Sequence, residues 1–310
     1  MQESLCSCSL LTVFLLCLFT NNSATEYTFF PPIKSNIGDK AIIESDGTIE
    51  YHYLRVIDHH QSVKQDNVCM YKCQGEVTAV AVDDSGLITS QQYVINEIST
   101  KTEPIDTPLL HVNDIIDVSI APDGKRTYKL NNNLIAVKDL PFQLVTTLVK
   151  GTTQKEREAY SLLLPQSPIS IGDTWFVDAD EYVRMIQKFY GGDASKTMVF
   201  GRGIIEYTKS INNKEFISYG THLSVHHLPV PPQIGFELND SSDNAEYDWT
   251  VVDPVGESGI ITQRPIVEDA STYRSSHAKG KAFQDGHIVD IENTRIEKTI
   301  RHEHVTYEDK

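Results

Sequence analysis

Cysteine is scarce in this sequence, and three of its five cysteines lie within the first 17 residues. Beyond them stand only Cys69 and Cys73, too few for a disulfide-stabilised scaffold. On one continuous strand these two would lie about 13 Å apart, at ~3.3 Å per residue, which is too far for a disulfide. A helical turn, or a bend near Gly75, would bring them together. The sequence therefore leaves a local disulfide and two free buried thiols as alternatives.

Basic residues are also few, since 27 Lys and Arg stand against 43 Asp and Glu, for a formal net charge of -16. A surface this negative repels phosphates and anionic lipid headgroups, which argues against nucleic acid or a charged membrane face as a partner. Apolar residues at 40% and charged residues at 23% are globular values, which argue against a disordered or fibrous chain. The 310 residues are enough for one large β domain or two small ones.

Long hydrophobic runs are missing as well. The longest, Leu10 to Phe19, is about half the ~20 residues that a membrane-spanning helix requires, and it has the length of a signal-peptide core. The small polar stretch Asn21 to Ala24 follows it. We therefore predict a signal peptide over residues 1–24 and export to the periplasm, the cell envelope or the medium. The segment before the run has Glu3 and no Lys or Arg, so a retained amphiphilic anchor is the alternative.

Turn-forming dipeptides recur along the chain, each beside an alternating or apolar run. They tolerate the positive φ that tight hairpins need, and β-branched and aromatic residues fill their flanks. This pattern predicts a β-meander. The dipeptides are Asp46-Gly47, Ser85-Gly86, Asp123-Gly124, Asn212-Asn213 and Asp285-Gly286.

The segment from Glu215 to His227 shows strand alternation most clearly. One face would pack and the other would be solvated or would line a site, as in an antiparallel sheet. The first face has Ile217, Tyr219, Leu223 and Val225, and the second has Ser218, His222, Ser224 and His226. We therefore predict a mainly β protein, a large curved antiparallel sheet or half-barrel-like meander with one to three short helices.

Two stretches have helical spacing. Pro141 to Leu164 predicts a short helix, a stop at Gly151 and a capping box at Thr153 and Glu156. Asp180 to Tyr190 places apolar residues at helical intervals, although its first half would also suit a strand.

For domain organisation we expect a single β-rich domain over residues 25–310, with halves 25–138 and 165–310 joined by a short helical segment. Pro229 to Pro232 is typical of a stiff connection. The acidic run from Asn239 to Asp248 is then expected to be an exposed loop.

Three segments resemble a group of uncharacterised exported bacterial β-rich proteins, many of them lipoproteins. Val118 to Leu130 is similar to their strand–PDGK–strand hairpin. Leu162 to Trp175 looks like their GDxW connection into a strand, and Lys279 to Thr294 is similar to a late hairpin around an Asp-Gly turn. The resemblance implies a long, curved antiparallel sheet with helices against its concave side, and it implies no activity. The chain departs from the group at Cys17, which lacks the preceding small residue of a lipoprotein cleavage site.

Histidine is plentiful, with 11 residues, and raises a metal hypothesis. His302 and His304 fall on one strand face at close spacing, whereas His222 and His226 share a face about 13 Å apart at ~3.3 Å per residue. These four residues are the metal candidates. The alternative, which we favour, is that they are solvated or packing side chains, so that no metal and no cofactor is predicted.

Carboxylates gather around Trp175, where they would suit a sugar site or a hard cation. The Gly and the terminal Glu of a calcium loop are missing from this stretch. Asp173, which follows Gly172, is expected to form a turn. The four carboxylates are Asp173, Asp178, Asp180 and Glu181.

The favoured hypothesis is a non-catalytic exported protein that holds an apolar ligand on a concave sheet or serves as an interaction module. Its partner would be a lipid or another envelope protein. The sequence has no complete catalytic set: Gly256 to Gly259, for example, is one residue short of a hydrolase nucleophile turn, and a plain turn explains it. The alternative is a metal- or carboxylate-dependent hydrolase, motivated by the histidines and by the carboxylates around Trp175.

Overall fold

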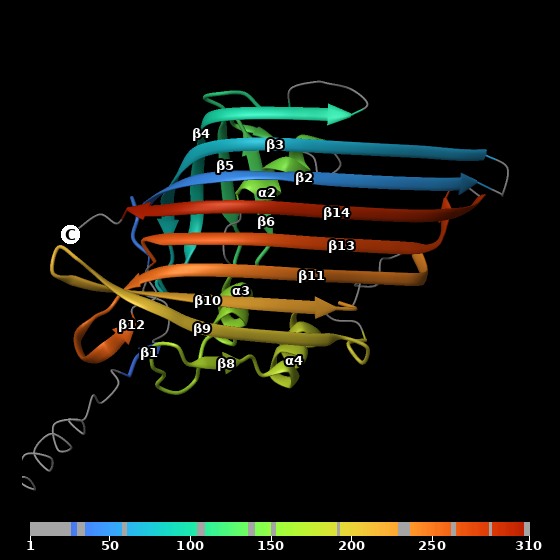
Figure 1. Ribbon diagram of the computed structural model, residues 1–310. Helices are drawn as coiled ribbons and strands as arrows, with labels where there is room; N and C mark the ends of the chain where they lie inside the picture. The colour runs from blue at the N-terminus through green and yellow to red at the C-terminus, as the bar shows by residue number, and fades with distance from the viewer. Residues whose placement is uncertain are drawn as a thin grey trace, which may run out of the picture.

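The computed structural model of the protein is dominated by one large antiparallel sheet, with three short helices packed on one side of it among the described residues (Figure 1). The predicted mainly β class is therefore confirmed. The predicted signal peptide lies outside the described residues. The structure describes residues 26–29, 35–57, 61–103, 109–135, 140–149, 153–190, 193–228, 236–261, 265–284 and 287–306.

Within the described chain, this sheet has 12 strands in the order β7-β6-β5-β4-β3-β2-β14-β13-β11-β10-β9-β8. A second, two-stranded parallel sheet pairs β1 (Thr28–Phe29) with β12 (Ile260–Ile261). The strands of the large sheet are β2 (Lys40–Ile57), β3 (Gln61–Val82), β4 (Ile88–Glu103), β5 (Ile115–Ile120), β6 (Arg126–Leu130), β7 (Asn133–Leu134), β8 (Thr174–Phe176), β9 (Met198–Ile211), β10 (Lys214–His226), β11 (Phe236–Pro254), β13 (Val267–Gln284) and β14 (His287–Thr306).

The sheet joins the two ends of the described chain. Strand β2 pairs with β14 along its whole length, from Lys40 opposite Thr306 to Ile57 opposite Val289. The strands before residue 138 and those after residue 165 therefore belong to one continuous sheet. Its edges are β7 and β8, so the sheet is open. No helix among the described residues is long and apolar enough to cross a membrane.

The central strands are unusually long. Strand β3 has 22 residues, which at ~3.3 Å per residue span about 70 Å. Figure 1 shows β2, β3, β14, β13 and β11 side by side across the molecule. A bulge opposite Gln74 and Gly75 interrupts the pairing of β3 with β4, and β5 and β6 run behind the long strands at this end. Bulges bend strands, so this irregularity curves the sheet.

Three helices cover the same face of the sheet, which we call the inner face; the opposite one is the outer face. They are α2 (Leu140–Leu148), α3 (Gln154–Ser161) and α4 (Ala179–Tyr190). The predicted capping box starts α3: Thr153 Oγ1 accepts from the Glu156 amide at 3.3 Å, and the Thr153 amide donates to Glu156 Oε2 at 2.8 Å. Both helical predictions are confirmed, and the expected stop at Gly151 lies outside the described residues.

Apolar side chains fill the space between the helices and the inner face. Helix α2 packs over β2 to β6, and α3 and α4 pack over β9 to β11. The largest fully buried side chains of these clusters are Tyr27, Ile43, Tyr93, Ile95, Leu110, Ile116, Leu144, Leu148, Ile205, Ile217, Tyr219 and Leu223. The part of the inner face under the helices is thus occupied by the protein's own side chains.

Several predicted hairpins are confirmed. Asn212 and Asn213 both have positive φ, at 49° and 61°, and connect β9 to β10. Gly124 has φ 83° between β5 and β6, and Gly86 has φ 81° between β3 and β4. The turn at 285–286 lies outside the described residues, although Gln284 and His287 pair on either side of it.

The turn expected at Asp46-Gly47 is wrong, because both residues lie inside β2. A Cβ atom at Gly47 would lie 2.2 Å from the Lys298 carbonyl oxygen and 2.9 Å from Tyr71 Oη. This glycine therefore allows close packing between strands, and not a turn.

The exposed loop expected from Asn239 to Asp248 is also wrong, because this run belongs to β11. The acidic Asp243 on this strand is buried and pairs with Arg274 of β13, whose Nε donates to Asp243 Oδ1 at 3.0 Å. A partner distant in sequence thus accommodates a charge that appeared to require solvent. The preceding Pro229 to Pro232 lies outside the described residues.

The two cysteines of the described chain are free thiols buried on the inner face of β3. The alternative of a local disulfide between Cys69 and Cys73 is therefore wrong, because the strand runs unbroken through both residues. Cys73 Sγ lies 3.5 Å from the Tyr93 hydroxyl oxygen. Burial raises the pKa of both thiols.

Candidate functional site

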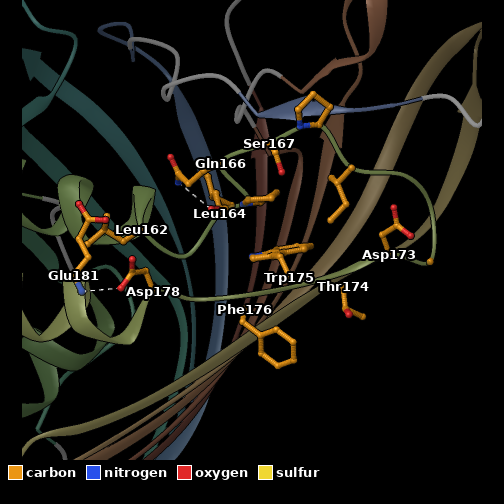
Figure 2. Close-up of a pocket in the computed structure, with 14 residues that line it drawn as sticks. Leu162, Leu164, Gln166, Ser167, Asp173, Thr174, Trp175, Phe176, Asp178 and Glu181 are labelled. Atoms are coloured by element: carbon orange, nitrogen blue, oxygen red, sulfur yellow. Dashed lines mark hydrogen bonds between the residues drawn. The ribbon is translucent and has the colours of Figure 1, made fainter.

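A pocket of about 610 Å³ lies beside edge strand β8 and is the candidate functional site (Figure 2). The segment from Leu162 to Asp173, which leads from α3 into β8, forms one wall. Strand β8 and the start of α4 form the rest. Its volume falls within the roughly 300–1,000 Å³ range of small-molecule sites.

Trp175 lines the pocket, although most of its side chain is buried in the core and only 8% of the residue is exposed. Trp175 Nε1 donates to the Leu163 carbonyl oxygen at 2.7 Å, so the ring has a fixed orientation. On β9, directly opposite, Gly203 leaves the space that the indole fills, because a Cβ atom there would lie 2.0 Å from Trp175 Cζ2. The site is therefore preorganised around an aromatic ring whose polar atom is already satisfied.

The wall opposite the indole is formed mainly by apolar side chains on a loop held by its own hydrogen bonds. Gln166 Nε2 donates to the carbonyl oxygens of Ser161 and Leu164, both at 3.1 Å. These bonds fix the loop without using a side chain of the sheet. The apolar wall residues are Leu162, Leu164, Pro165, Pro168 and Ile169.

Carboxylates lie at both ends of β8. Asp173 accepts from the Ser170 amide at 3.0 Å, which confirms its turn-forming role. Asp178 accepts from the Glu181 amide at 2.9 Å and thereby caps α4. The structure thus brings Asp173, Asp178 and Glu181 to the pocket, whereas Asp180 is not among the residues that line it. All three are exposed, so the rim is negative and favours a cationic or hydrogen-bond-donating group.

The candidate histidines of β10 lie outside this pocket, on the outer face. His222 Nδ1 lies 2.7 Å from Asp248 Oδ1, directly across to β11. His226 Nε2 lies 2.9 Å from Ser224 Oγ on the same strand. These are polar contacts of a solvated sheet face.

His302 and His304 share the outer face of β14. His302 Nδ1 lies 2.8 Å from Asp269 Oδ1 of β13. Strands β11 and β13 separate this pair from the histidines of β10. Within the described part of the chain, no three His, Cys, Asp or Glu residues come together as a group that could hold a metal ion.

A charged group that sequence reasoning missed lies on the inner face of β13 and β14. Glu268 is the cross-strand neighbour of Glu303, and Arg301 Nη2 donates to Glu303 Oε2 at 2.8 Å. Arg301 Nη1 also donates to the Leu148 carbonyl oxygen, at 3.4 Å, and so ties the end of α2 to the sheet. Burial and the charge of Glu303 raise the pKa of Glu268 to about 7. Only the strand pairing reveals this cluster, because no local sequence pattern distinguishes Glu268 from a surface carboxylate.

No known protein family and no curated protein matches the chain. Among solved structures it is similar to lipovitellin, with 8% identity, 89% of this chain and 26% of that chain covered, and a TM-score of 0.33. The chain thus spans about a quarter of that protein. The outer membrane protein OprG from Pseudomonas aeruginosa has 7% identity, coverages of 87% and 98%, and a TM-score of 0.21. A LolA superfamily protein from Nitrosomonas europaea has 9% identity, coverages of 80% and 83%, and a TM-score of 0.16. Scores this low show no shared fold, so only this chain's own geometry bears on its function.

Proposed function

We propose that the protein is an exported, non-catalytic binding protein whose ligand site is the pocket around Trp175. The observation that carries this proposal is the preformed pocket itself, which has apolar and polar side chains in its lining, a fixed Trp175 and a carboxylate rim. Ligand sites typically combine such an apolar lining with a few oriented polar groups. Export is supported by the apolar run from Leu10 to Phe19.

The proposed ligand has an apolar body, which packs against the apolar side chains of the pocket wall, and a cationic or hydrogen-bond-donating end, which lies near Asp178 and Glu181. Asp173 and Asp178 already accept backbone hydrogen bonds that stabilise a turn and a helix start. Among the described residues that line the pocket there is no His, Cys, Lys or Arg. This composition supports binding over a hydrolase that needs a histidine or cysteine, and an anionic lipid headgroup would meet repulsion at the rim.

The first test is binding of Nile red, a neutral apolar dye that fluoresces when it leaves water. Wild-type protein is expected to enhance the fluorescence of the dye saturably. Ser167→Trp places an indole in the pocket from an exposed position and is expected to abolish the enhancement. The matched control is Ser119→Trp, an exposed position on β5. Equal dye binding by both variants, with unchanged melting temperatures, would show that the pocket is not the ligand site.

The natural ligand can be sought by native mass spectrometry of untagged protein from its own host. We expect a noncovalent mass that leaves on denaturation and that is absent from Ser167→Trp. A ligand retained in full by Ser167→Trp would place the binding site elsewhere.

A further inference from the structure

The free edge of β8 borders the same pocket. Asp173, Trp175 and Val177 direct their backbone N–H and C=O groups toward β9. The Val177 amide donates to the Gly201 carbonyl oxygen at 2.9 Å, and the Asp173 carbonyl oxygen accepts from the Ile205 amide at 3.3 Å. Trp175 lies between them, opposite Gly203. In an antiparallel pair the intervening residues direct their backbone N–H and C=O groups the other way.

Thr174 and Phe176 are those intervening residues, so their backbone N–H and C=O groups lie along the edge of β8 that faces away from β9. Strand β8 is the last strand of the sheet in the described part of the chain, and no described strand pairs with this side of it. An unpaired edge of this kind is a template for another extended chain.

Exposed apolar side chains flank this edge on the outer face. Phe176 is 70% exposed, Phe200 55% and Met198 57%. The rings of Phe176 and Phe200 have centroids 6.5 Å apart, so they form one patch. Contiguous exposed apolar patches of this kind mark interaction surfaces.

The two faces of β8 therefore offer different surfaces to a strand added at its edge. Side chains of an added strand point alternately to opposite faces. Those on the inner side would enter the pocket beside Trp175, and those on the outer side would cover Phe176 and Phe200. A small compact ligand would use only the first of these surfaces.

Charge selects the kind of segment. Asp173 and Asp178 bracket β8, and Glu181 lies beside Asp178 at the start of α4. The whole chain has a formal net charge of -16, which opposes pairing with a second copy. A segment with Lys or Arg at its ends complements this rim.

Resting on the proposed function of the pocket, we propose that its ligand is an extended, basic peptide segment of a partner protein, which pairs with the backbone of Thr174 and Phe176 as an added strand. An apolar side chain of the segment enters the pocket, and its cationic side chains lie near Asp173, Asp178 and Glu181.

The test is an array of short extended peptides with Lys near both ends and varied residues between, probed with the full-length mature protein. Each peptide is matched by one with Glu in place of Lys. A third version has N-methyl groups on alternate residues, which removes the backbone donors of one strand edge. We expect binding by a subset of Lys peptides and none by their Glu counterparts. N-methylation in the pairing register should weaken binding at least about tenfold, as expected from the loss of one or two backbone hydrogen bonds.

Thr174→Pro removes one outward N–H without removing a bond to β9, and Thr174→Ala is its matched control. Thr174→Pro should weaken peptide binding about tenfold more than Thr174→Ala does, because only proline removes the backbone N–H. Melting temperatures of both variants show whether β8 is still folded. The added-strand proposal would be overturned if the wild-type protein bound Nile red but no peptide, or if it bound plain and N-methylated peptides equally well. Either result would leave the pocket proposal standing. If the wild-type protein does not bind Nile red, the proposal that the pocket is the ligand site is refuted. A concentration-dependent dimer in sedimentation that disappears in Thr174→Pro would identify a second copy as the occupant, and would equally overturn the proposal.

Discussion

Replacing Glu268 with Gln should make the stability of the protein less sensitive to pH. The pKa of Glu268 is raised from 4.5 to about 7, first by burial and then by the charge of Glu303, while Arg301 acts in the opposite direction. Asp253 and Asp269 add smaller repulsions. The folded protein therefore holds a proton on Glu268 that the unfolded chain releases.

This difference in bound protons sets the direction in which the stability changes with pH. The contribution of Glu268 to the free energy of unfolding is fully present below about pH 4.5 and is lost as the pH rises through about 7. The interval from 4.5 to about 7, at ~1.36 kcal/mol per pH unit, gives a loss of about 3 kcal/mol. This is an upper bound, because Glu268 is only partly buried and solvent screens its charge.

Glu268→Gln keeps a neutral side chain of the same shape at every pH. We expect wild type and variant to have nearly equal unfolding free energies at about pH 5, and the variant to be more stable by up to about 3 kcal/mol at about pH 8. The unfolding free energies of wild type and variant are measured by urea denaturation, which is monitored by the fluorescence of Trp175 and Trp249. Glu246→Gln, which changes an exposed carboxylate on the outer face of β11, is the matched control. A difference between wild type and Glu268→Gln that does not change with pH would refute the reasoning.

Three further predictions concern other parts of the structure. Gly203→Ala should destabilise the protein by about 2 kcal/mol or more and abolish Nile red binding, because its Cβ would lie 2.0 Å from the Trp175 ring; Gly220→Ala, whose nearest atom would lie at 3.4 Å, should melt close to wild type. Cys69 and Cys73 should resist iodoacetamide at neutral pH in the folded protein and react once it is unfolded in urea, because burial raises the pKa of both thiols; rapid labelling of the folded protein in a mass spectrum would contradict this. Thr153→Ala should lower the unfolding free energy by about 1 kcal/mol through loss of the α3 cap, whereas Thr153→Ser should retain most of it; equal melting temperatures for the two variants would argue against the cap.

Local signals in the sequence predicted the elements that depend on local contacts. The alternation from Glu215 to His227 identified β10, and Asn212-Asn213 identified the hairpin before it. The Thr153 and Glu156 spacing identified the start of α3. Each of these elements depends on contacts between residues that are close in sequence, so the sequence is sufficient to predict it.

The candidate site was predictable only in part. The carboxylates around Trp175 were recognisable because they lie close together in sequence, and three of the four line the pocket. That Asp178 caps α4 depends on where the helix begins. The space for the indole depends on Gly203, which the pairing of β8 with β9 places opposite it.

The sequence by itself determined the mainly β class, the hairpins at positive-φ dipeptides and the two helical stretches. Only the tertiary structure decided that Gly47 serves close strand packing, that β2 lies beside β14, and that Glu268 meets Glu303. It also decided that Cys69 and Cys73 stay unpaired and that the histidines spread over the outer face. The physical reason is common to all of these: they depend on which strands pair and in which register, and that is set by burial of the whole inner face and not by any short stretch of the chain.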